Sequence, residues 1–551
     1  MLEPPNIRAI PAASDADAAA RGLDDWRSAA DGALLDDETG TAVLQALFGN
    51  APFLGQCALH HPESLVDTLQ FGPAEALAKL VSHVEEQAAA ARTDEAGTMA
   101  LLRQARRRAA LIIGTADVAL GWSGVRVTAA LSRFAAGALR IGVDHLLAVA
   151  TESGDLAQLD PAHPGRGSGF VVLGMGKLGG GELNYSSDVD LIVLYDPDIT
   201  PYRGRRELPD FFVRLTRKLA GLMETPTGDG YVCRVDLRLR PDPSATPPAI
   251  SLPAAEGYYA SLGQNWERAA MIKARPVAGD GDAGVAFLKA LRPFMWRKHL
   301  DFAAIQDIHS IKRQIHAHKG GAEVAVNGHN VKLGAGGIRE IEFFAQTQQL
   351  IWGGRYQSLR VRRTEAALHA LHALERVTDA EMHELIESYW YLRRVEHRLQ
   401  MVNDQQTHVL PEDDEGMARI GTFLGYDSLG AFVDHLRGHL ERVSAHCGRL
   451  FEDAPGLAAQ DSVGGNLVFT SGDNDPGTME TLTRIGFRNP AAVSNAIRAW
   501  HHGRIPATRS TRSRELLTEL VPSMLSAFAR TPDPDQAFAR FDGFLASLPS
   551  G

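Results

Sequence analysis

Apolar residues recur three and four positions apart over long stretches of the chain, which is the pattern of amphipathic helices. From about residue 27 to residue 158 this spacing is nearly continuous, as in EALAKLVSHVEEQAAAARTDEAGTMALLRQARRRAALIIG. It returns beyond about residue 298, for example in IREIEFFAQTQQLIWGG and LGAFVDHLRGHLERVSAHCGRLFED. The pattern therefore predicts helices on both sides of the middle of the chain.

The middle of the chain has a different pattern. FVVLG (170–174) reads as a short buried strand, DVDLIVLYD (188–196) as a second strand, and GYVCRVDLRLRP (230–241) as a third that ends at Pro241. Between the second and third strands, LPDFFVRLTRKLAGLME (208–224) has the spacing of an amphipathic helix. The sequence thus predicts an α+β fold, with a sheet domain embedded in a mainly helical protein.

Loop-rich segments divide the chain into regions. PAHPGRGSG (161–169) and DAPGLAAQDSVGGN (453–466) have the composition of loops. From them we expect a flexible lead-in over 1–25, a helical region over 26–160, a sheet domain over 161–297, a helical domain over 298–455, and a linker with a small helical module over 456–551.

Composition narrows the class of protein. The net charge of −11 weighs against a nucleic acid or an anionic membrane as the principal partner. Cys57, Cys233 and Cys447 lie far apart without a CxxC spacing, which predicts a reducing compartment and neither a disulfide framework nor a zinc site. No long apolar run and no signal-like N-terminus are present, so we expect a cytoplasmic protein. The arginines at 103 and 106–108 are interpreted as a solvated helix face.

The stretch GMGKLGGGELNYSSDVDLIVLYD (174–196) allows three interpretations. Its glycines satisfy G-x-G-x-x-G, as in a dinucleotide-binding fold, but GGGELNYSSD is too poor in helix formers for the helix that such a fold requires. A phosphate-binding Walker loop is excluded because Leu178, not Ser or Thr, follows Lys177. A plain structural turn stays open beside the third interpretation, a metal-dependent nucleotidyltransferase.

The third interpretation depends on two carboxylates. Asp188 and Asp190 are two positions apart on a strand, so they share a face. At a separation near 4 Å they repel each other by about 4 kcal/mol at an effective dielectric constant of 20. A Mg²⁺ ion offsets this repulsion, prefers oxygen ligands, and holds phosphate oxygens.

The predicted third strand supplies another acid. Alternation places Asp236 on one face with Arg234, Arg238 and Arg240, and sends the intervening apolar residues to the other face. Arginine matches phosphate oxygens through paired hydrogen bonds. We therefore expect Asp236 to be a third metal ligand within a phosphate-binding wall.

Some motifs carry weaker signals. KLGAGGIREIEF (332–343) is either an anion-binding helix N-terminus or an ordinary helix start. Lys273 and Arg275 could reach phosphates, although a structural salt bridge is the preferred interpretation. Arg393 is interpreted as decorating the exposed side of a helix.

Leu178-Gly179-Gly180, followed by Ser187-Asp188-x-Asp190 and a third Asp, resembles the motif of DNA polymerase β-type nucleotidyltransferases. The chain is more closely similar to the glutamine synthetase adenylyltransferase/adenylyl-removing family, through GMGKLGGGELNYSSDVDL, RVDLRLRP, NWERAAMIKARP, KLGAGGIREIEF and LRRVEHRLQMVNDQQTHVLP in that order. GNLVFTSGDNDPGTMETLTRIGFRNP also resembles the segment that links that family's two catalytic halves.

The resemblance implies the N-terminal, adenylyl-removing half plus linker. It implies that phosphate releases AMP from a tyrosine of glutamine synthetase as ADP, with the PII signal protein as a partner. It further implies that Mg²⁺ binds Asp188, Asp190 and Asp236, and that nucleotide or phosphate is bound by Lys177, Gly179, Gly180, Ser187, Arg234, Arg238 and Arg240. Two alternatives are ATP-dependent attachment of AMP to the same tyrosine and a non-catalytic scaffold that binds PII.

Overall fold

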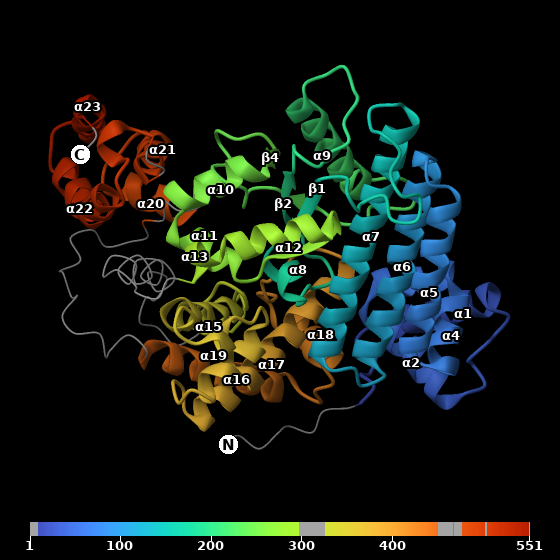
Figure 1. The fold of residues 1–551 in the computed structure, drawn as a ribbon. Coiled ribbons are helices and arrows are strands. Elements are labelled where there is room, and N and C mark those ends of the chain that lie inside the picture. The colour runs from blue at the N-terminus through green and yellow to red at the C-terminus, as the bar shows by residue number, and fades with distance from the viewer. Residues whose placement is uncertain (1–8, 297–325, 450–466, 468–475, 502–503, 550–551) are drawn as a thin grey trace.

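The computed structural model describes residues 9–296, 326–449, 467, 476–501 and 504–549 (Figure 1). Helices dominate, and one mixed sheet lies among them, which confirms the α+β class. The first part of the helical domain expected over 298–455, residues 298–325, lies outside the described residues, as does the start of the expected linker, 456–466.

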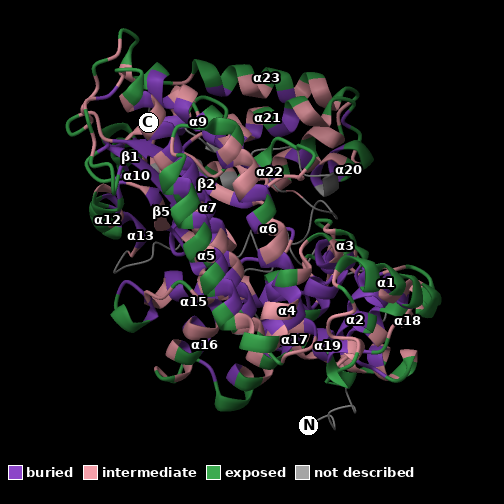
Figure 2. Cartoon of the chain, turned by 90° about the vertical axis from the view of Figure 1, so that its right-hand side faces the viewer, coloured by how far each residue is buried: buried purple, intermediate pink, exposed green. Residues whose placement is uncertain are grey.

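The N-terminal region is built of packed helices. The first begins at Ala16, where the Asp15 side chain accepts a hydrogen bond from the Ala18 backbone, so the later part of the expected lead-in is helical. In order, the helices are α1 (Ala16–Ala29), α2 (Glu38–Asn50), α3 (Pro52–His60), α4 (Pro62–Phe71), α5 (Pro73–Ala90), α6 (Glu95–Val118) and α7 (Gly124–Glu152). Figure 2 shows α5 and α7 with exposed residues on one side and buried residues on the other.

Helix α7 is the one described helix that is long and apolar enough to cross a membrane by length and composition. Half of its most apolar window is buried inside the protein. Leu139 and Leu147 of α7 are fully buried in the same core as the sheet. The apolar character of α7 is therefore that of a core helix.

The sheet domain follows. Its elements are β1 (Phe170–Gly174), α8 (Gly176–Gly180), β2 (Val189–Tyr195), α9 (Leu208–Glu224), β3 (Val235–Asp236), β4 (Ala249–Ser251), α10 (Leu252–Ser261), α11 (Asn265–Met271), β5 (Arg275–Gly279), α12 (Gly281–Ala290) and α13 (Arg292–Met295). The strand order is β3-β2-β1-β5, with β4 also paired to β2. Strand β1 runs antiparallel to β2 and β5, whereas β3 and β4 run parallel to β2.

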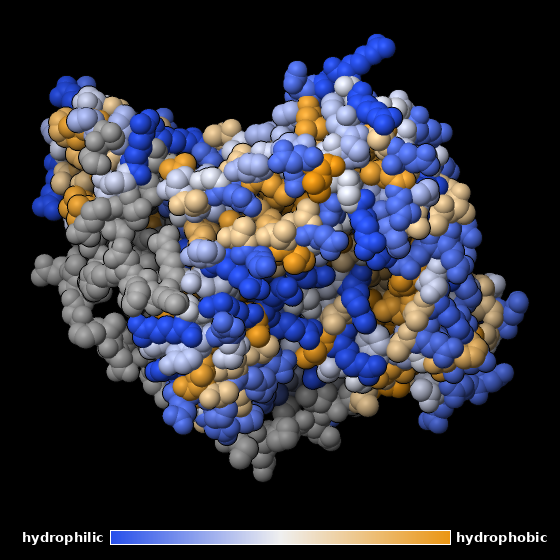
Figure 3. Space-filling model, viewed as in Figure 1, coloured by the Kyte–Doolittle hydropathy of each residue, from blue (hydrophilic) through white to orange (hydrophobic). Residues whose placement is uncertain are grey.

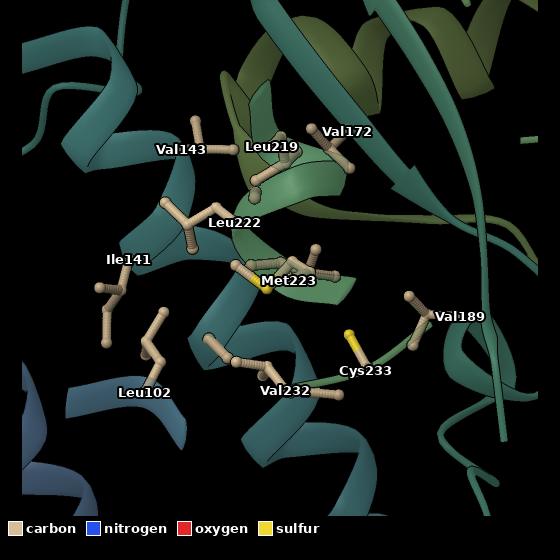
Figure 4. Close-up of a cluster of buried hydrophobic side chains, with 14 of the residues drawn as sticks. Leu102, Ile141, Val143, Val172, Val189, Leu219, Leu222, Met223, Val232 and Cys233 are labelled. Atoms are coloured by element: carbon tan, nitrogen blue, oxygen red, sulfur yellow. The ribbon is translucent and has the colours of Figure 1, made fainter. Parts of the chain in front are cut away.

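One face of the sheet shares a hydrophobic core with the N-terminal helices. Figure 4 shows Val172 of β1 and Val189 of β2 in the same cluster as Leu219 and Met223 of α9 and Ile141 of α7. All residues of β1 and all of β2 except Asp190 are buried, which explains why the apolar residues of both strands predict them.

The predicted strand over 230–241 is wrong in length, because β3 contains only Val235 and Asp236. After Asp236 the chain turns: the Asp236 carboxylate accepts from the Arg238 backbone, and Arg240 donates to the Leu237 and Pro243 carbonyl oxygens. Alternation of apolar and polar residues therefore produced a strand signal in a segment that local side-chain hydrogen bonds fold into a loop.

A second helical region packs below the sheet domain in the view of Figure 1. It comprises α15 (Ile338–Trp352), η1 (Gln357–Leu359), α16 (Thr364–His372), α17 (Asp379–Asn403), α18 (Asp414–Phe423) and α19 (Leu429–Arg449). The C-terminal module has its own core and comprises α20 (Pro476–Arg484), α21 (Pro490–His501), η2 (Pro506–Thr508), α22 (Thr511–Ala529) and α23 (Pro534–Ser547). Its Arg504 pairs with Asp242, in the loop that follows β3.

Candidate functional site

The candidate site lies where β2 begins. Asp190 on β2 and Asp236 on β3 are register partners of parallel strands, so their side chains leave the sheet on the same face. Asp188 directly precedes β2, and its charge acts on Asp190 together with that of Asp236. The fold thus brings the three predicted acids within electrostatic reach of one another.

The surroundings of Asp190 disfavour the ionised form of its carboxyl group. Burial, followed by the negative charges of Asp188 and Asp236, raises the pKa of Asp190 to about 7. The positive charges of Lys332 and Arg238 oppose this rise in the pKa. A divalent cation would relieve the same repulsion, so the donor chemistry of the three acids fits Mg²⁺.

Two of the acids are bonded to neighbouring side chains. Burial raises the pKa of Asp236, but hydrogen bonds and the charge of Arg238 outweigh it and hold that pKa below its usual range. Asp188 accepts a hydrogen bond of 2.8 Å from the Gln406 amide. Among the described residues, no three His, Cys, Asp or Glu side chains are arranged as a metal-ligand group.

The glycine-rich loop supports the acids from the side of β1. It forms the short helix α8, which ends at Gly181 in the left-handed conformation. Gly176 has φ of +48°, and a Cβ there would lie 2.5 Å from Asp190 Oδ2. A Cβ on Gly179 would lie 2.2 Å from the Lys273 carbonyl oxygen, so this glycine is required for internal packing. Gly180 is buried beside Glu182.

The two lysines near the loop form salt bridges, one with the partly buried Glu342 and the other with the buried Glu182. Lys177 lies 3.0 Å from Glu342 of α15, and burial, with the charge of Arg393, lowers the pKa of this lysine to about 8. Lys273 lies 2.7 Å from Glu182, with both side chains almost fully buried. The structural interpretation of Lys273 is confirmed, and Lys177, expected to bind nucleotide, has its ammonium group engaged by Glu342.

The arginines expected to form a phosphate-binding wall have separate partners. Arg234 donates to the Ser186 carbonyl oxygen and to the Tyr231 hydroxyl. Arg240 braces the loop after β3. Arg275, which is not part of the predicted wall, donates to the carbonyl oxygens of Leu178 and Gly179. Arg238 is the most exposed member of the predicted wall that borders the acids, with 57% of its side chain accessible.

A small cavity lies behind the turn that leads to the acids. It has a volume of about 50 Å³, and Ser187 and its neighbour Ser186 contribute to its lining. Asn184 and Gln400 also line it, and each has a buried amide nitrogen without a hydrogen-bond partner among the described atoms. The lining is mostly apolar, and these two amide nitrogens are polar groups in it that a water molecule could satisfy.

Residues far away in the sequence complete the site. The charge of Lys332, in KLGAGGIREIEF, lowers the pKa of Asp190. Gln406, in LRRVEHRLQMVNDQQTHVLP, donates a hydrogen bond to Asp188. Both motifs are among those that carry the family resemblance, but a sequence alone does not show which of their side chains reaches the acids.

Two interpretations of arginines as surface residues are wrong. Arg393 is fully buried and donates to the Glu182 carbonyl oxygen and to Asn184. In the patch on α6, Arg103 is buried and donates to the Thr225 and Gly230 carbonyl oxygens, while Arg106 pairs with Asp404. These arginines join the helical regions to the sheet domain. Figure 3 shows a band of hydrophilic residues between α12 and α15, where the sheet domain meets the second helical region.

Comparison with known proteins extends over nearly the whole chain. Residues 41–290 match the family model described as glutamate-ammonia ligase adenylyltransferase, and residues 309–451 match the model described as GlnD PII-uridylyltransferase. The bifunctional glutamine synthetase adenylyltransferase/adenylyl-removing enzyme of Rhizobium meliloti is 49% identical over 560 residues, covering 99% of this chain and 56% of that protein. The enzyme of the same name from Mesorhizobium japonicum is 50% identical over 513 residues, covering 93% and 52%. This chain thus spans about half the length of these curated relatives.

Proposed function

This chain is a homologue of the bifunctional glutamine synthetase adenylyltransferase/adenylyl-removing enzymes, and from that premise we propose that it removes AMP from an adenylylated tyrosine of glutamine synthetase. Inorganic phosphate is the acceptor, so the products are ADP and the free tyrosine. The observation that carries the proposal is the pairing of Asp190 with Asp236 beside Asp188, because clustered carboxylates are the ligands that phosphoryl-transfer enzymes use for metal ions.

In this mechanism Asp188, Asp190 and Asp236 would hold Mg²⁺, which neutralises charge on the transferred phosphoryl group when it is bound. A phosphate oxygen attacks the phosphorus of the AMP ester, the bond from phosphorus to the tyrosine oxygen breaks, and the phenolate leaves and takes a proton. Phosphate is already ionised at neutral pH, so its attack needs little general-base catalysis. A phenol, with a pKa near 10, is also a tolerable leaving group.

Two positive side chains beside the acids, Arg238 and Lys332, would attract phosphate in this mechanism. Arg238 and Lys332 act on the charge of Asp190 from two different regions of the chain. Their positive charge favours approach of the anionic phosphate toward a site that is otherwise negative. Ser187 and the glycine loop approach the nucleotide in this proposal.

The PII signal protein is the proposed regulatory partner. The match of residues 309–451 to a PII-uridylyltransferase model supports it, because enzymes of that description act on PII. That segment also supplies Lys332 and Gln406 to the acids, so a partner that binds there has a direct route to the site.

The test mixes this chain with AMP-modified glutamine synthetase, Mg²⁺ and inorganic phosphate, and follows ADP by chromatography. The variant Asp188→Asn/Asp190→Asn is compared with Asp196→Asn, which changes a carboxylate just beyond the other end of β2. Phosphate-dependent ADP from the wild type and Asp196→Asn alone supports the proposal. AMP transfer from ATP onto unmodified glutamine synthetase, without ADP release from the modified protein, would assign the opposite activity. Neither reaction, even with PII added, would favour a non-catalytic scaffold.

A further inference from the structure

A segment of the second helical region lies against the turn that carries the acids. This segment comprises Asp404–His408, directly after α17, and we call it the strap. Asp404 accepts hydrogen bonds from the Ser186 hydroxyl through its carbonyl oxygen (2.8 Å) and through Oδ1 (3.0 Å). Gln406 donates to Asp188 Oδ1 at 2.8 Å. The contacting residues are two positions apart on both segments, so the strap and the turn run in matching register.

The strap is fixed by groups outside the turn. Arg106 of α6 donates to both carboxylate oxygens of Asp404, at 2.6 and 2.7 Å, and both side chains are only 12% exposed. At the other end, the His408 carbonyl oxygen accepts from the Val331 backbone at 2.9 Å. Asp404 itself has φ of +52°, a left-handed conformation that Asp tolerates better than most residues. The strap therefore has a defined position independent of the acids.

The N–H, the hydroxyl and the carbonyl oxygen of Ser186 each have a hydrogen-bond partner. Its backbone N–H donates to Gln400 Oε1, its hydroxyl donates to Asp404, and its carbonyl oxygen accepts from Arg234. The N–H and the hydroxyl of Ser186 thus bond to the second helical region, and its carbonyl oxygen bonds to Arg234 of the sheet domain. The path of the chain into the acids follows from these partners.

We propose that the strap positions the acids, with Gln406 orienting Asp188 for a divalent cation and Asp404 fixing the turn. This inference rests on the proposed function in one respect, the presence of a cation on the acids. A neutral amide that donates to one carboxylate oxygen restricts rotation of the carboxylate and leaves its negative charge for the metal. A lysine at this position would instead compete with the cation for that charge. Gln406 and Asp404 are positioning residues, since neither contacts the reacting atoms.

The test measures cation binding without turnover, by titrating the whole chain with Mn²⁺ and following free Mn²⁺ by electron paramagnetic resonance. The variant Gln406→Ala is compared with Gln405→Ala, which removes the same side chain from an exposed neighbour in the strap. Removal of a group that orients a metal ligand lowers metal affinity about 10-fold or more, which we expect for Gln406→Ala. Gln405→Ala is expected to bind Mn²⁺ like the wild type.

The matching change at Asp404 tests the fixed turn. Asp404→Ala is expected to weaken Mn²⁺ binding, whereas Asp404→Asn keeps an acceptor oxygen for Ser186 and restores part of the affinity. Thermal unfolding of each variant shows whether it is folded. Recovery of Mn²⁺ affinity in Asp404→Asn would also exclude a general loss of folding as the cause of weaker binding.

Equal affinity of the two glutamine variants would overturn the role of Gln406. If the variant Asp188→Asn/Asp190→Asn binds Mn²⁺ with the affinity of the wild type, the Mn²⁺ ion binds elsewhere and the whole inference is overturned. Failure of the wild type to release ADP while Mn²⁺ binding follows the expected order would overturn only the proposed function.

Discussion

Asp190 and Asp236 sit directly opposite each other on parallel strands, and the pKa of Asp190 is raised to about 7 by burial and by the charges of Asp188 and Asp236. An ordinary aspartate is fully ionised at neutral pH, so this carboxylate opposes folding above its unfolded pKa whenever no cation is present. The arrangement costs stability in the free protein and is suited to binding positive charge.

Asp190→Asn is expected to stabilise the metal-free protein while abolishing catalysis. Asparagine has nearly the same shape and carries no charge, so the repulsion from Asp188 and Asp236 disappears. At about pH 8 with a chelator present, we expect the free energy of unfolding to rise by about 1 kcal/mol or more, because one pKa unit corresponds to about 1.4 kcal/mol. Thermal or denaturant unfolding measures it. Asp196→Asn should leave stability within error, and a lower stability of Asp190→Asn would contradict the strain assigned to this carboxylate.

Gly176→Ala and Gly181→Ala form a matched pair. Both positions have positive φ, +48° and +71°, so each substitution is expected to cost about 1–2 kcal/mol of stability. A Cβ at Gly176 also meets Asp190 Oδ2 at 2.5 Å, while a Cβ at Gly181 has no atom within 4 Å. We expect only Gly176→Ala to lose activity, on the order of 10- to 100-fold, because a displacement near 1 Å has that effect. Equal kcat values for the two variants would disprove the steric link to Asp190.

Lys273→Met is expected to destabilise the protein by about 3–5 kcal/mol, because it leaves the buried Glu182 carboxylate without its cation. The double variant Lys273→Met/Glu182→Gln should recover part of this loss, and unfolding of the complete mutant cycle by urea measures the coupling. Arg419→Met, which breaks the exposed pair with Glu415, is the control and should cost less than about 1 kcal/mol. Similar losses at the buried and exposed pairs would rule out the assigned role of Lys273.

Glu267 predicts a dependence of stability on pH. Burial raises its pKa to about 8, so the folded protein holds a proton that the unfolded chain releases near its ordinary pKa. The unfolded state binds fewer protons between these values, and stability therefore falls as pH rises. Between about pH 5.5 and about pH 8 we expect the wild type to lose about 2–3 kcal/mol more than Glu267→Gln. Urea unfolding at the two pH values measures it, and parallel losses in both proteins would contradict the raised pKa.

The parts of the fold that follow from local pattern were predictable. Strand β1 is a continuous apolar run, β2 is apolar except for Asp190, and α9 spans Leu208–Glu224 as its apolar spacing indicates. Strands β4 and β5 were not predicted, because they are short and are fixed by pairing to β2 and β1. In the segment after β3, alternation was outweighed by the hydrogen bonds of Arg238 and Arg240.

The same distinction applies to the candidate site. Spacing on a strand placed Asp188 and Asp190 near each other, and the parallel register adds Asp236. Nothing local to Gln406 indicates that its amide reaches Asp188, since the two residues are 218 positions apart. Likewise, the charge of Arg393 suggested the surface, whereas burial of this residue depends on acceptors at Glu182 and Asn184 that only the folded chain provides.

The contacts of Ser186 have a consequence for how this chain folds during its synthesis. Its hydroxyl partner, Asp404, is translated 218 residues later, and Asp404 must also meet Arg106, which lies 298 residues before it. A nascent chain that has left the ribosome only as far as the sheet domain contains Arg234 but lacks Gln400, Asp404 and Gln406, the other side chains that contact this turn and Asp188. Its carboxylates are present without the contact that orients Asp188, so the arrangement of the three acids is completed only after the strap has been translated.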